Sequence, residues 1–162
     1  MRLQNYTNIP NDKIKDMISF VRPPGISNFH VEIKNYRYGT HRGTCYPDGC
    51  PGYHVTANPL VVISITKNEN AFPLYETHKN GSGYINSLLI SREEAFVHVI
   101  THELRHLWHK KIPKGYGRVW GARGQYSDRD ADAYAIKKVR EWRRRSMNYK
   151  TIAAMRHCKC II

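Results

Sequence analysis

The order of apolar and polar residues predicts one helix and three strands in the first ninety positions. From Asn11 to Val21 the apolar side chains recur at helical spacing and stop before a Pro-Pro-Gly sequence, so a short helix is expected. Residues 28–36 alternate between apolar and polar, as a half-buried strand does. Residues 58–66 are rich in β-branched side chains and 83–90 in apolar ones, and both segments are expected to be strands.

Two longer helices are predicted in the second half of the chain. Ser91 and Glu94 have the spacing of a capping box, and no glycine or proline follows until Pro113, so about twenty residues can be helical. A final helix is expected from near Ser127 to Arg145, because the arginines of its last turns suit the negative end of a helix dipole. Strands followed by helices indicate an α+β domain with a small antiparallel or mixed sheet.

A glycine-rich stretch, residues 39–52, follows the first predicted strand and contains Cys45 and Cys50. We expect a long hairpin loop or a disordered excursion there. The other two cysteines are Cys158 and Cys160. Neither pair has the spacing of a zinc knuckle, but four thiols that meet in space can form a structural zinc site, or disulfides in an oxidising setting. In a reducing cytosol, free thiols are expected.

The length of 162 residues suits one domain, which we assign to residues 1–145, followed by a C-terminal tail of unassigned structure at 146–162. The net charge of +13 favours anionic partners, of which nucleic acid is the commonest; a solvated surface is the alternative explanation. No apolar run approaches the roughly 20 residues that span a bilayer, and the first residues contain no signal-peptide core. The expectation is a cytoplasmic protein without a membrane partner.

The helix expected after Ser91 contains His102, Glu103 and His106 in the spacing His-Glu-x-x-His. A helix turns about 100° per residue, so the two histidines lie about 40° apart, one turn apart in height, and direct both imidazoles toward one point. This geometry can hold one metal ion, and Glu103 is placed to contact water bound to that ion. The alternative is a pair of interior histidines, but the glutamate between them favours the metal.

Helical wheels give each of the two long helices a packing side and a polar side. On the first helix the motif borders the apolar side, and the opposite side carries Glu94, His98, Thr101, Arg105 and His109. On the final helix Asp128 and Asp132 lie on a stripe of alanine and larger apolar residues, whereas Asp130 points away from it. Carboxylates on a packing stripe are costly unless a positive group compensates them, and a metal supplies that charge. A catalytic zinc also needs a third protein ligand.

The segment THELRH, followed on the final helix by DRDADAYA, resembles the zincin metallopeptidases, particularly their gluzincin branch. The resemblance implies a zincin-like fold and a Zn²⁺ ion held by His102, His106 and Asp128, with Asp132 orienting a ligand histidine. The family ligand at the position of Asp128 is usually Glu. The shorter side chain requires a closer approach of the final helix, or Asp132 is the ligand instead.

The same resemblance implies hydrolysis of peptide bonds. Water activated by zinc and by Glu103 as general base attacks the peptide carbonyl, and Glu103 passes the proton to the leaving amine. The substrate would be a protein or peptide, bound along an edge strand for which residues 83–90 are the candidate. An oxyanion helper is expected among Tyr116, Arg118, Tyr126 and the nearby histidines.

Two other functions stay open. Residues 112–126 combine basic and aromatic side chains, which is similar to a surface that binds single-stranded nucleic acid, although a substrate loop or an ordinary folded loop has the same composition. If this segment binds DNA, the chain resembles the SprT-type proteases. A basic nucleic-acid-binding protein with a structural metal is therefore one alternative. A regulatory zincin that cleaves one specific protein partner is the other.

Overall fold

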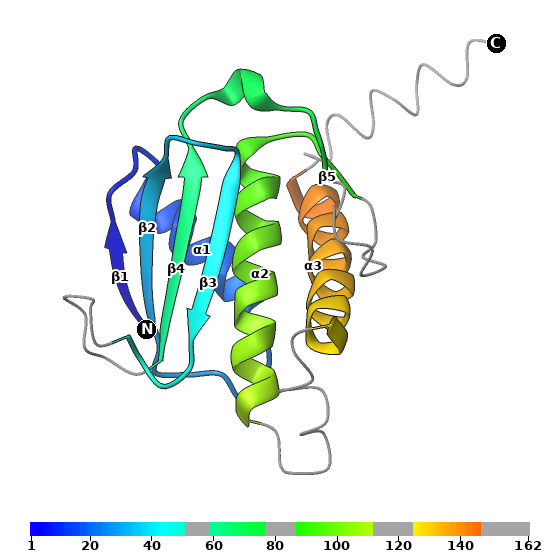
Figure 1. Ribbon diagram of the computed structural model, residues 1–162. Coiled ribbons are helices and arrows are strands. Elements are labelled where there is room, and N and C mark those ends of the chain that lie inside the picture. The colour runs from blue at the N-terminus through cyan, green and yellow to red at the C-terminus, as the bar shows by residue number, and fades with distance from the viewer. Residues whose placement is uncertain (51–58, 77–86, 112–124, 147–162) are drawn as a thin grey trace.

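The computed structural model describes residues 1–50, 59–76, 87–111 and 125–146 (Figure 1). Its helices in these ranges are α1 (Asn11–Val21), α2 (Arg92–Lys111), α3 (Gln125–Ser146) and the short 3-10 helix η1 (Glu69–Ala71). The strands are β1 (Arg2–Asn5), β2 (His30–Tyr36), β3 (His41–Tyr46), β4 (Leu60–Thr66), β5 (Leu74–Glu76) and β6 (Ser87–Leu89). The predicted α+β class and the predicted positions of α1, β2, β4, α2 and α3 are confirmed.

The main sheet is mixed, with the strand order β1-β2-β4-β3. The first three of these strands are parallel, and β3 runs antiparallel to β4, with Cys45 opposite Val61. Strand β3 therefore forms one edge of the sheet, and in Figure 1 it is the strand beside α2. Strands β5 and β6 form a separate two-stranded sheet, in which Leu74 lies opposite Leu89.

One strand prediction is wrong, and another is confirmed only in part. Residues 41–46, expected within a loop, form β3 despite Gly43 in the middle of the strand. Residues 87–89 form a strand as predicted, but this strand, β6, pairs with β5 in the separate two-stranded sheet and is not an edge of the main sheet; residues 83–86 lie outside the described ranges. The edge beside α2 belongs to β3, because β4 inserts between β2 and β3.

The core lies between one face of the main sheet and the helices α1 and α2. Apolar side chains of α1 meet those of α2 and of the inward-facing sheet positions; the fully buried ones include Ile14, Met17, Phe96, Ile100, Ile33 and Ile63. Figure 1 shows α1 behind the sheet and α3 on the far side of α2. Each of these side chains contributes about 1.5–3 kcal/mol when it leaves water, so α2 is held firmly by its apolar side.

Most of the polar side of α2 is also buried, because both α3 and strand β3 pack against this helix. Glu94, His98, Thr101 and His109 are all at most 5% exposed. Partners compensate part of the cost of burying these groups. The Thr101 hydroxyl donates to the Val97 carbonyl, and the His109 ring meets Asp130. The helix is therefore fixed between the sheet and α3, which gives its side chains defined positions.

The N-terminus of α2 has the predicted cap. The Ser91 hydroxyl accepts the backbone N–H of Glu94 at 3.2 Å, and the Glu94 carboxylate accepts the backbone N–H of Ile90 at 3.0 Å. Glu94 also accepts two hydrogen bonds from Arg143, near the end of α3. These contacts tie the start of α2 to the end of α3, so the two helices are antiparallel neighbours.

Candidate metal site

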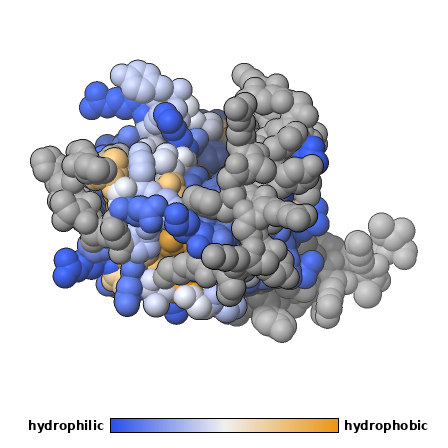
Figure 2. Space-filling model, turned by 60° about the horizontal axis from the view of Figure 1, so that its bottom comes forward, coloured by the Kyte–Doolittle hydropathy of each residue, from blue (hydrophilic) through white to orange (hydrophobic). Residues whose placement is uncertain are grey.

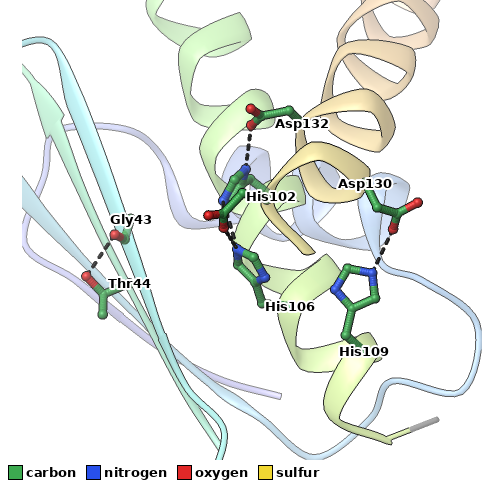
Figure 3. Close-up of polar contacts among 8 residues, drawn as sticks. Gly43, Thr44, His102, His106, His109, Asp130 and Asp132 are labelled. Carbon is green, nitrogen blue, oxygen red and sulfur yellow. Dashed lines mark hydrogen bonds and ion pairs between the residues drawn. The ribbon is translucent and has the colours of Figure 1, made fainter. Parts of the chain in front are cut away.

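His102 and His106 lie on successive turns of α2 and turn their rings toward each other (Figure 3). Their ring centroids are 4.6 Å apart, and the two Nε2 atoms are 2.9 Å apart. The side chains are 19% and 13% exposed, so the pair is shielded but still reached by solvent. The helical spacing thus brings both imidazole nitrogens to one point.

Asp128 reaches the same point from the first turn of α3. Its Oδ1 lies 3.1 Å from His106 Nε2 and 3.9 Å from His102 Nε2. Ligands bound at about 2.0–2.1 Å in a tetrahedral zinc site lie about 3.3 Å from one another, close to the mean of these separations. The group His102, His106 and Asp128 could hold a metal ion, with ligand atoms all within 4.8 Å of one another.

Asp132 lies one turn further along α3 and contacts the back of His102. Its Oδ1 is 2.7 Å from His102 Nδ1, and the Asp132 side chain is 1% exposed. A carboxylate only accepts hydrogen bonds, so the proton of the neutral imidazole is on Nδ1. The lone pair of His102 is then on Nε2, the atom that faces His106 and Asp128. In this structure Asp132 contacts a ligand candidate and Asp128 joins the ligand group.

Small residues allow α3 to come close enough for the short side chain of Asp128. The predicted stripe of α3 is buried, and its members Ala131 and Ala135 are both 0% exposed. Two alanines at a helix contact let the backbones approach more closely than larger side chains would. The buried alanines thus lie where α3 packs and where Asp128 Oδ1 comes to 3.1 Å from His106 Nε2.

Asp130 lies off the packing stripe of α3, where the helical wheel placed it, but it still contacts α2. Its Oδ2 accepts hydrogen bonds from Arg105 Nε at 2.5 Å and from His109 Nε2 at 2.7 Å, both on α2. Figure 3 shows the contact of His109 with Asp130 beside His102 and His106. The second turn of α3 is therefore bound to α2 on two sides, by Asp130 and by Asp132. In the sequence, this contact could have been inferred from Arg105 and His109, which lie four residues apart on the polar side of α2.

Glu103 lies between the histidine pair and strand β3 and is 7% exposed. Burial raises the pKa of its carboxyl group to about 7, although the nearby His102 acts in the opposite direction. The backbone N–H of Cys45 donates a hydrogen bond to this carboxylate. A carboxyl group with a pKa near neutrality can both accept and release a proton at physiological pH.

The two imidazoles have different electrostatic surroundings. Burial lowers the pKa of His102. The hydrogen bond to Asp132 and the charges of Glu103 and Asp132 raise this pKa by more than burial lowers it, so the net pKa is above the usual value of a histidine. Burial lowers the pKa of His106 to about 3, and the neighbouring His102 adds to this effect. His106 is therefore neutral at pH 7, the form in which imidazole binds metals.

Because Gly43 on β3 has no side chain, Glu103 can lie against the strand at this position. The sequence did not indicate this role of Gly43. A Cβ atom at this position would lie 2.5 Å from Glu103 Oε1 and 2.7 Å from Val99 Cγ2. Glycine inside a strand often marks such a close approach. A side chain at position 43 would therefore force the side chains of Glu103 and Val99 or the strand itself to shift.

We expect Gly43→Ala to lower the free energy of unfolding by about 1–3 kcal/mol, the usual cost of overpacking. Urea denaturation of the variant and the wild type measures this change. Thr44→Ala is the matched control, because the next residue of a strand points to the opposite face. Equal stability of Gly43→Ala and the wild type would contradict the close contact with Glu103.

Several predicted residues lie elsewhere or outside the described ranges. Cys45 and Cys50 are free thiols that pack into different apolar clusters, Cys45 in the main core and Cys50 against Leu60 and Val62. Burial raises the pKa of Cys45. Cys158, Cys160, Tyr116 and Arg118 lie outside the described ranges, as does the side chain of Tyr126. The structural zinc site and the oxyanion helper stay predictions.

Comparison with known proteins found no matching family model, curated protein or solved structure. The likeness to zincins thus rests on the two motif segments and on the arrangement of their side chains. Within the described residues, no helix is both long and apolar enough to cross a membrane. The described side chains visible in Figure 2 are mostly hydrophilic, with small apolar areas between them.

Proposed function

We propose that this protein is a zinc-dependent metallopeptidase of the zincin type. The observation that carries the proposal is the convergence of His102 Nε2, His106 Nε2 and Asp128 Oδ1 beside the buried Glu103. Two imidazoles and one carboxylate are a donor set typical of catalytic zinc, which keeps a fourth position for water. A structural site needs no proton acceptor, so the adjacent Glu103 favours catalysis.

Bound zinc would supply a Lewis acid that makes water more acidic and polarises the peptide carbonyl. Glu103 accepts a proton on a carboxylate oxygen and then releases it to the leaving amine, for which a pKa of about 7 is suited. Asp132 keeps the proton of His102 on Nδ1 and so directs the Nε2 lone pair toward the metal position. Asp130 holds the N-terminal part of α3 in place through Arg105 and His109.

The edge of β3 is the surface that we propose for an extended peptide. Within the described residues β3 pairs with β4 alone, so its other edge has backbone groups that no strand satisfies. An extended peptide binds such an edge through main-chain hydrogen bonds. The backbone of Gly43 and Cys45 approaches Glu103, so a peptide on this edge would lie next to the proton acceptor.

Removal of the metal tests the proposal. We expect the purified protein to contain about one zinc ion per chain, to cleave casein, and to lose this activity after dialysis against EDTA. Addition of zinc should restore the activity, whereas magnesium should not, because magnesium prefers oxygen ligands. Mass spectrometry of the metal content and release of casein fragments are the two measurements.

The substrate panel also separates the alternatives. Cleavage of casein would count against a regulatory zincin that acts on one partner. Zinc-containing protein without activity toward any substrate of the panel, together with binding of single-stranded DNA, would favour the nucleic-acid-binding function instead.

A further inference from the structure

A cavity of about 200 Å³ lies at the N-terminus of α2. Arg92 precedes His102 by ten residues, or about 15 Å along the helix axis, so this cavity is separate from the metal-ligand group. The polar residues that line it come from four segments of the chain and are Asn8, Lys13, Glu69, Ser91, Arg92 and Glu93.

Arg92 is the unusual member of this lining. The residue is 7% exposed, and its Nη1 donates a hydrogen bond to Asn8 Oδ1 at 2.7 Å. Its Nε and Nη2 atoms are buried and have no hydrogen-bond partner in the described part of the chain. Leaving the donors of a charged group buried and unsatisfied is costly, and native structures seldom do it without a reason.

The two unsatisfied atoms of Arg92, Nε and Nη2, form one edge of the guanidinium group. The N–H groups of Nε and Nη2 are parallel and fit the two oxygens of a carboxylate. Arg143 in the same protein uses this pair, because its Nε and Nη2 donate to the two oxygens of Glu94 at 2.7 Å and 2.6 Å. Arg92 therefore offers the same pair of donors that binds the Glu94 carboxylate in Arg143, but no carboxylate of the described residues accepts from it.

The charged side chains around the cavity balance one another, so the donors of Arg92, and not a net positive charge, must attract the ligand. Lys13 is paired with Glu93, and Glu69 opposes the effect of burial, which lowers the pKa of Arg92. Two cations and two carboxylates thus balance before any ligand enters. The first backbone N–H groups of α2 add a further attraction for an anion, since a helix N-terminus has free donors and a partial positive charge.

We propose that this cavity binds the carboxylate group of a small organic acid or of a peptide C-terminus. Nε and Nη2 of Arg92 donate to its two oxygens, and the guanidinium edge turns into the cavity when the ligand binds. The site does not depend on the proposed peptidase activity, because none of its residues belongs to the metal-ligand group.

Titration of the ¹⁵N-labelled protein followed by NMR tests this proposal. The probes are acetate, N-acetylalanine as a peptide-like carboxylate, and inorganic phosphate, each at constant ionic strength. We expect saturable shifts of the Arg92 Nε–H signal and of the amides of residues 91–93 with at least one carboxylate. The Arg143 Nε–H signal is an internal control that should not move, because Glu94 already occupies that side chain.

Two variants accompany the titration. Arg92→Lys keeps the charge but loses the parallel N–H pair, and should weaken carboxylate binding at least about tenfold. If Arg92→Lys does not fold, Lys13→Gln is the second variant to titrate. It changes a residue at the rim of the cavity, and the ligand-induced shifts of the Arg92 Nε–H signal should persist in it. A preference for acetate over N-acetylalanine would identify a small acid as the ligand, and the reverse would identify a peptide terminus. Absence of saturable shifts with both carboxylates, or binding of phosphate alone, would overturn the proposal.

Discussion

Replacement of Glu103 by glutamine should reduce casein hydrolysis by about 10²–10⁴-fold, the usual contribution of a positioned proton acceptor. Glutamine has nearly the same shape, and its amide oxygen can still accept the backbone N–H of Cys45. It cannot accept the proton that peptide hydrolysis must transfer. Initial rates of wild type and variant at matched zinc content measure the effect.

The fold and metal content of Glu103→Gln should stay unchanged. Burial raises the pKa of Glu103 to about 7, so a neutral side chain is tolerated at this position. The proposed metal ligands are other residues, and one zinc ion per chain should remain. Hydrolysis within tenfold of the wild-type rate would show that Glu103 is not the proton acceptor. Loss of single-stranded DNA binding with no change in hydrolysis would favour the nucleic-acid function.

Removal of a metal ligand should produce the second large effect, complete loss of zinc from the purified protein. His106→Ala and Asp128→Ala each leave only two of the three converging ligand atoms. A catalytic zinc site has three protein ligands, and affinity falls steeply when one is lost. Mass spectrometry of the metal content after dialysis measures the loss, and circular dichroism shows whether the helices persist.

Two further carboxylates make the ligand experiment specific. Asp132→Asn should weaken zinc binding about 10–100-fold without abolishing it, as expected for a residue that orients a ligand histidine. Asp12→Ala removes a fully exposed carboxylate on α1 and should leave the metal in place. If Asp128→Ala kept the zinc and Asp132→Asn lost it, Asp132 would be the third ligand.

Long periodic segments were predictable because their own side chains carry the pattern. The bounds of α1, Asn11–Val21, agree with the prediction, and the cap at Ser91 forms as its spacing indicated. The stripe of α3 is buried at Ala131, Asp132 and Ala135. In each case the periodicity of a helix places the residues on one side before any tertiary contact is known.

Short strands were not predictable in the same way. β1 has four residues, of which one, Leu3, is apolar, and it exists through its pairing with β2. β3 contains Gly43 and reads as a loop by composition, yet it pairs along its whole length with β4. A strand of this kind is stabilised by neighbours that are distant in sequence, so its local residues carry little signal.

The sequence by itself determined the elements that carry the chemistry. It placed His102, Glu103 and His106 on one capped helix, and Asp128 and Asp132 on the packing stripe of another, since helical geometry follows from residue spacing alone. The tertiary structure alone decided how these elements meet. Packing at Ala131 and Ala135 brings Asp128 Oδ1 to 3.1 Å from His106 Nε2, and the order of the strands puts β3 against Glu103. Contacts between residues distant in the chain depend on the packing of the whole domain, which no local pattern encodes.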